Sequence, residues 1–105
     1  MLPVHILIDA TLKSLTERGV FYTILQRGEQ SSGTILLKVF DQKNTCKLLT
    51  QQRNLDGELE WMNAMDQDTP AEPDADAYIV RTKARDPDMW IIEVEDPAMI
   101  NPFEV

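Results

Sequence analysis

The sequence predicts a single α+β domain, and three observations lead to this prediction. An apolar pattern with helical spacing opens the chain, four β-rich runs with short connections follow, and a second helical segment precedes a last strand. Short connections between consecutive strands are typical of antiparallel sheets, so we expect a four-stranded antiparallel meander with the final strand in the same sheet. The 105 residues are enough for one hydrophobic core.

The first expected element is an amphipathic helix over Val4–Arg18. Its apolar side chains recur every three or four positions along one side of the helix: Val4, Ile8, Leu12 and Leu15. Gly19 follows as the stop residue, and the charge of Arg18 suits the negative end of the helix dipole.

Four strands are expected next, because each run is rich in β-branched, aromatic or aliphatic residues. They cover Val20–Gln26, Thr34–Phe40, Thr45–Gln51 and Leu59–Met65. The first run is apolar on both parities, which is typical of a strand that is covered on both faces. Gly28 and Gly33 bound a loop between two strands, and we interpret it as a hairpin because a phosphate loop leads into a helix.

Two prolines and several carboxylates in residues 66–73 end the run of strands. Asp74 is then a predicted N-cap for a helix over Ala75–Arg85, which has acidic residues at its start and basic residues at its end. Pro87 ends this helix, since the residue before a proline avoids helical angles. The last strand is Trp90–Glu95, where glutamates alternate with apolar residues, so we expect one of its faces to meet water.

Charge is divided unevenly along the chain. The first 54 residues carry seven basic and four acidic side chains, a net +3, whereas the remainder carries three basic and fourteen acidic ones, a net −11. This asymmetry favours self-complementary packing or a cationic partner. Basic residues along the predicted strands do resemble a nucleic-acid platform together with Tyr22 and Phe40: Arg27, Lys38, Lys43, Lys47 and Arg53. The acidic remainder and a pI of about 4.4 oppose nucleic-acid binding.

The sequence also favours a cytoplasmic location with no membrane partner. It contains no apolar run of roughly 20 residues and no signal-peptide pattern at its start. Its single cysteine, Cys46, fits a reducing compartment and is interpreted as a small buried apolar residue.

Several short motifs carry a family resemblance. They are Arg18–Gly19–Val20, Arg27–Gly28 before Gly33–Thr34, Trp61–Met62 after Asp56–Gly57, and the run from Ala75 to Asp96. With them the chain resembles domain-of-unknown-function family 1491, a group of small bacterial proteins, over roughly residues 7–96. The resemblance implies a compact single domain with no assigned biochemical role, so it carries over no site residues.

Carboxylates are the only candidates for chemistry. Glu93 and Glu95 share one face of a strand, roughly 7 Å apart, and with Asp86 or Asp88 they form the alternative hypothesis, a metal-dependent hydrolase. The only histidine, His5, stands near the chain start, where we do not expect catalysis. We predict no cofactor, and the sequence identifies no small-molecule ligand.

The leading hypothesis is a non-enzymatic module for protein interaction or self-association. Residues 1–96 are expected to form the domain, and residues 97–105 an extended apolar tail. Four side chains of this tail are the predicted docking residues: Met99, Ile100, Phe103 and Val105.

Overall fold

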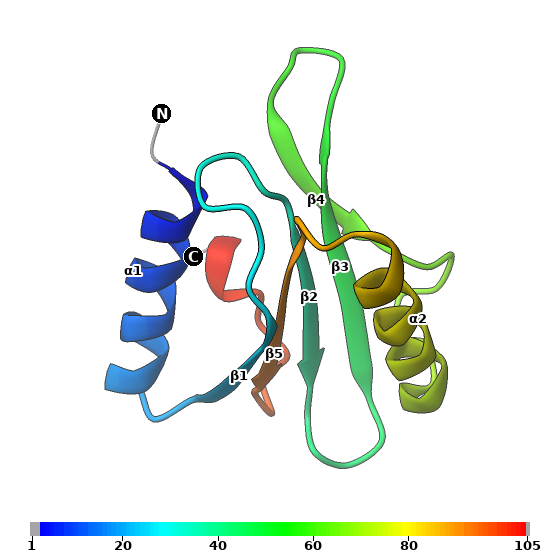
Figure 1. The fold of residues 1–105 in the computed structure, drawn as a ribbon. Helices are drawn as coiled ribbons and strands as arrows, with labels where there is room; N and C mark the ends of the chain where they lie inside the picture. Colours follow the sequence, from blue (N-terminus) through cyan, green and yellow to red (C-terminus); the bar gives the residue numbers. More distant parts are fainter. Residues whose placement is uncertain (1–2, 105) are drawn as a thin grey trace.

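The computed structural model describes residues 3–104, which build a five-stranded sheet with one helix on each face (Figure 1). The elements are α1 (Val4–Glu17), β1 (Phe21–Gln26), β2 (Ile35–Phe40), β3 (Cys46–Arg53), β4 (Leu59–Asn63), α2 (Glu72–Arg85), β5 (Trp90–Glu95) and a short 3-10 helix η1 (Pro102–Glu104). The predicted α+β class and the predicted order of elements are therefore confirmed. Between residues 3 and 104, neither helix has the length and apolar character that a membrane crossing requires.

The strand order corrects the predicted meander. The order across the sheet is β1-β5-β2-β3-β4, so only β2, β3 and β4 follow one another as antiparallel neighbours. Strand β5 lies between β1 and β2, antiparallel to the first and parallel to the second. The four-stranded meander is wrong because the connection between β1 and β2 is long enough to pass over an intervening strand.

This connection, residues 27–34, lies directly on the start of β5. A Cβ added to Gly28 would lie 2.3 Å from the carbonyl oxygen of Asp88, and one added to Gly33 would lie 2.8 Å from the same oxygen. The indole Nε1 of Trp90 donates a hydrogen bond to the carbonyl oxygen of Glu29 at 2.8 Å. The segment is therefore a crossing loop and not a hairpin, and both glycines allow the close approach of two backbones.

The same loop also holds the first turn of α1. The backbone N–H groups of Val4 and His5 donate to the carbonyl oxygens of Ser31 and Gln30, at 3.3 and 3.0 Å. These groups have no partner within the helix, and no side chain caps it. At the other end, Gly19 has a φ of +74°, which confirms the predicted helix stop.

The sheet has a hydrophobic core on each face. On the α1 side the buried cluster is Ile8, Leu12, Leu15, Ile35, Leu37, Val39, Trp90, Ile92 and Val94. On the α2 side it is Leu36, Cys46, Leu48, Ala75, Ile79 and Ile91. Because β2 and β5 are inner strands, they supply residues to both clusters. The face of β5 that was predicted to meet water is only partly exposed, because Ile91 is buried there while Glu93 and Glu95 are half-buried.

The C-terminal tail covers part of the α1 face, beside the helix (Figure 1). Phe103 lies in η1 and stacks on Trp61 of β4, with 5.5 Å between the ring centroids. Met99 also packs against the core on this side. The tail is therefore not extended throughout, since it ends in a helical turn.

Strand β1 lies at the edge of the sheet, and its first three side chains are exposed. Phe21 retains 73% of its accessible surface. The prediction that this strand is covered on both faces is wrong. Strand β5 takes the inner position beside β2, and helix α2, which covers the other face of the sheet, contacts β3.

Helix α2 begins at Glu72, earlier than the predicted start at Ala75. Pro73 hides this start in the sequence, but a proline in the first turn costs no intrahelical hydrogen bond. The predicted end at Arg85 is confirmed.

We predict that Gly28→Ala destabilises the protein by about 3 kcal/mol, because the new methyl group would overlap the backbone of Asp88 and Trp90. The measurement is urea unfolding followed by tryptophan fluorescence. The matched control is Gly57→Ala, which strains a positive φ of +81° but meets no atom within 4 Å, at a cost of about 1 kcal/mol. Equal losses for the two variants would contradict the close contact.

Candidate functional site

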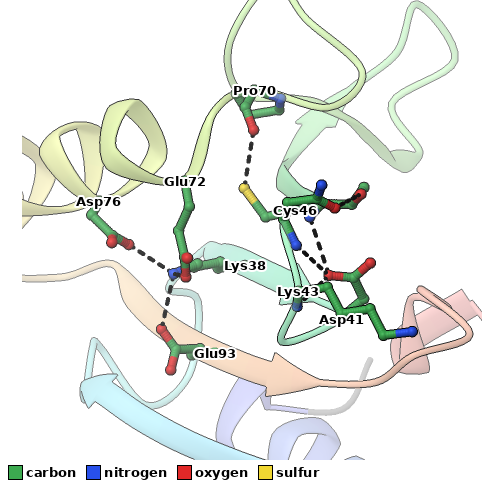
Figure 2. A network of polar contacts seen from close by, with 10 residues as sticks. Lys38, Asp41, Lys43, Cys46, Pro70, Glu72, Asp76 and Glu93 are labelled. Atoms are coloured by element: carbon green, nitrogen blue, oxygen red, sulfur yellow. Dashed lines mark hydrogen bonds and ion pairs between the residues drawn. The ribbon is translucent and has the colours of Figure 1, made fainter.

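The most charged interior site is an ion cluster around Lys38 on the α2 side of the sheet (Figure 2). The Lys38 side chain is only 2% exposed. Its Nζ lies 2.7 Å from Glu72 and 2.8 Å from Asp76 of α2, and 3.4 Å from Glu93 of β5. Figure 2 shows the three carboxylates converging on the ammonium from helix and strand.

Each member of this cluster is positioned by a different part of the fold. Lys38 and Glu93 are partners in the parallel register of β2 and β5. Glu72 and Asp76 are four positions apart, so they project from the same side of α2. The early start of the helix is what gives Glu72 this place.

The electrostatics fix Lys38 in its charged form. Desolvation of the ammonium lowers its pKa, but the hydrogen bonds to Asp76 and Glu72 outweigh that effect and hold the pKa above its ordinary value. A lysine that acts as a base or nucleophile needs the opposite shift, toward neutral pH. The cluster therefore fastens α2 to the sheet.

We predict that Lys38→Met lowers the free energy of unfolding by about 2–3 kcal/mol at pH 7, because it leaves three carboxylates close together without their cation. Since the pKa of Lys38 is raised on folding, its stabilisation is complete below the ordinary lysine pKa of about 10.4 and is lost as the pH rises further. Denaturation of both proteins from pH 7 to 11 measures this. The control Lys43→Met alters an exposed side chain and should change stability by less than about 0.5 kcal/mol.

The four carboxylates of the metal hypothesis are not brought together. Glu93 pairs with Lys38, and Glu95 accepts a hydrogen bond from the side chain of Gln42. Asp86 and Asp88 are exposed and precede the first residue of β5, so they lie at the end of the strand opposite to Glu95. Within residues 3–104, no three histidine, cysteine or acidic side chains are arranged to hold a metal ion.

Cys46 and His5 are both engaged in structural contacts. Burial raises the pKa of the Cys46 thiol, and its Sγ donates to the carbonyl oxygen of Pro70 at 3.2 Å (Figure 2). This confirms that Cys46 is a buried residue. His5 lies in the first turn of α1, with Nδ1 2.9 Å from the carbonyl oxygen of Gln30.

The basic residues of the strands do not share one surface. Lys38 is buried under α2, whereas Lys47 donates from the α1 side to the carbonyl oxygen of Met99 at 3.2 Å. Arg27 lies over the ring of Trp90, 5.9 Å from its centroid. Between residues 3 and 104, Lys38 is the one cation within ion-pair distance of a carboxylate.

The crossing loop contains a nest of donors that is filled by its own carboxylate. Ser31 and Ser32 each direct a backbone N–H and a hydroxyl to Glu29, at distances from 2.6 to 3.1 Å. The backbone N–H of Ser32 and the hydroxyl of Ser31 are the main causes that lower the pKa of Glu29 to about 2. Ser31 and Ser32 therefore bind a carboxylate of their own loop.

We predict that Glu29→Gln destabilises the protein near neutral pH and that this difference disappears in acid. The folded-state pKa of Glu29 is lowered, so its stabilisation is present above the unfolded pKa of about 4.3 and is lost as the pH falls toward 2. Thermal unfolding between pH 7 and 2 measures the gap between the two proteins. The control Gln30→Ala, in the same loop, should run parallel to the wild type, and a gap that persists at pH 2 would contradict the nest.

The predicted docking residues of the tail are divided by the structure. Met99 and Phe103 are half-buried against the domain itself, while Ile100 remains 43% exposed. Val105 lies outside the described residues. Most of the described apolar tail is therefore already engaged within the chain.

The open edge of β1 is a more accessible apolar surface, which the sequence did not reveal. Phe21 and Tyr22 are exposed there, beside a hollow of about 200 Å³ that is also lined by Thr16, Gly19 and Val20. A larger hollow of about 340 Å³ lies between the start of α1 and the β3–β4 hairpin, with Val4, Leu7 and Leu59 on its walls. The apolar sequence of β1 was the available signal, but it indicated burial.

Comparison with known proteins gives a consistent result. The model of the family DUF1491, described as a protein of unknown function, matches residues 2–104. A crystal structure of a DUF1491 family protein from Caulobacter crescentus is 32% identical, covers 98% of this chain and 94% of its own, and superimposes with a TM-score of 0.83. The NMR structure of a DUF1491 family protein from the same organism gives 32% identity, coverage of 97% and 92%, and a TM-score of 0.84.

A structure with lower sequence identity supports the fold alone. The solution structure of a protein from A. tumefaciens is 16% identical over 90% of this chain and 86% of its own, with a TM-score of 0.69. None of the curated proteins matches the chain.

Proposed function

We propose that this chain, which belongs to the DUF1491 family, is a non-enzymatic domain that acts by binding protein at the open edge of its sheet. The observation that carries the proposal is β1, an edge strand of six uncharged residues with Phe21 exposed at its start. Exposed backbone groups on such a strand are a template for pairing with another extended segment.

The ionisable groups of the interior support this proposal over the hydrolase alternative. Lys38 is held charged by three carboxylates, one of which is Glu93 of the hypothetical metal site. Glu95 is hydrogen-bonded to Gln42. Both strand glutamates therefore have partners that serve the fold.

We predict that a benzoylphenylalanine at position 21 forms a discrete covalent adduct when irradiated in the organism that encodes the chain, because Phe21 lies at the proposed contact. The matched control is position 80, where Val80 is 66% exposed on α2. The adduct must be suppressed by Thr23→Lys, which charges the edge of β1. Gel mobility and mass spectrometry measure its size. An equal yield of adduct at positions 21 and 80, or a yield at position 21 that Thr23→Lys does not reduce, would refute the proposed function.

A further inference from the structure

The two edges of the sheet differ in how they are protected against pairing. Strand β4 is five residues long, carries Glu60 at its second position and follows Glu58. Strand β1 is a run of six without a charge or a proline. Soluble proteins usually place charges, prolines or bulges at a sheet edge. The bulge of β1 comes late, between Ile24 and Gln26, and leaves its first four residues regular.

The backbone groups that β1 directs outward follow from the hydrogen bonds of β5. The backbone N–H of Trp90 donates to the carbonyl oxygen of Thr34, and that of Asp96 donates to the carbonyl oxygen of Phe40, both at 2.9 Å. The even-numbered residues of β5 therefore direct their backbone groups toward β2. Because the direction of the backbone N–H and C=O groups alternates from one residue to the next, the odd-numbered residues of β5 direct these groups toward β1. Their partners there, Phe21 and Thr23, are thereby engaged. Tyr22 and Ile24 then direct their N–H and C=O groups away from the sheet.

We infer that β1 pairs with β1 of a second copy of this chain, antiparallel, about a two-fold axis through Thr23. This inference rests on the proposed function and names its partner. Tyr22 of each copy then lies opposite Ile24 of the other, which forms about four hydrogen bonds between the outward backbone groups. The two sheets become one continuous sheet.

The side chains of β1 fit this register. An antiparallel pair places opposite residues on the same face, so Tyr22 packs beside a β-branched isoleucine, a favourable cross-strand pair. Thr23 lies opposite Thr23 of the second copy in a non-hydrogen-bonded pair of the new interface, where the two α-carbons are about 4.5 Å apart. No charged residue of β1 faces another across the axis. Pairing through β4 would instead add Glu60 of each copy to the interface.

The net charge of −8 gives the association a distinctive response to salt. Two copies with the same net charge repel one another, and salt screens this repulsion. A cationic partner would respond in the opposite way. A pairing of one short strand is at the small end of specific interfaces, so we expect a dissociation constant in the micromolar range, about 10⁻⁵ M.

The first experiment is disulfide trapping of the purified chain in a Cys46→Ala background. Thr23→Cys should form a covalent dimer within minutes of mild oxidation, because the two positions meet at the axis. Phe21→Cys is the control: Phe21 is among the most exposed residues of the strand, but it lies roughly 14 Å from its own copy in this register. Equal rates of cross-linking for the two variants, or a faster rate for Phe21→Cys, would overturn the register and the inference.

Sedimentation equilibrium of the unmodified chain provides the second experiment. The dimer fraction should rise at least twofold between about 0.05 and about 0.5 M NaCl. Thr23→Lys and Thr23→Glu should each be monomeric, and their equimolar mixture should associate again. A monomer under all these conditions would overturn the inference. If position 21 still forms its adduct with another protein in cells, the proposed function stands with a different partner, whereas loss of both results refutes both.

Discussion

The insertion of β5 between β1 and β2 is the constraint on which the rest of the structure depends. The connection of residues 27–34 has to cross the start of β5, and Gly28 and Gly33 permit contact with the backbone around Asp88. The carbonyl groups of this connection also receive the first N–H groups of α1. One loop therefore sets the relative places of a helix and three strands.

The ion cluster and the open edge both result from this insertion. Because β5 runs parallel to β2, Glu93 lies beside Lys38, and α2 adds Glu72 and Asp76 from above. The same insertion moves β1 outward by one strand, so its apolar side chains lose the cover that an inner position would provide. A buried charge is thus neutralised at the centre of the sheet, while an uncharged strand is left at its edge.

Local features of the structure could be predicted from the sequence. The apolar spacing of α1, the stop at Gly19, the end of α2 at Arg85 and the bounds of β5 are all encoded within a few residues. Strand order is not encoded in this way, since it depends on contacts between distant segments. The residues of β1 look like those of an inner strand, and nothing near them in the sequence reports that β5 displaces them.

The same limit applies to the candidate site. Lys38 stands in an apolar strand, where alternation alone suggests a solvated rim, and its partners come from 34 to 55 positions later in the chain. Glu72 directly precedes Pro73, and because a residue before a proline disfavours helical angles, the sequence predicts a later start for α2. The carboxylates of the metal hypothesis are close in sequence, but Glu93 pairs with Lys38 and Glu95 accepts a hydrogen bond from Gln42.

The strand that completes the middle of the sheet, β5, is translated after the four other strands. While the ribosome still holds residues 90–95, the segments of β1 and β2 have a vacant slot between them, and neither core contains its β5 side chains. Such a nascent chain exposes inner strand edges to water and to other polypeptides. The sheet can therefore close only after residues 90–95 have been translated, and until then β1 and β2 each lack the neighbour that covers their inner edge.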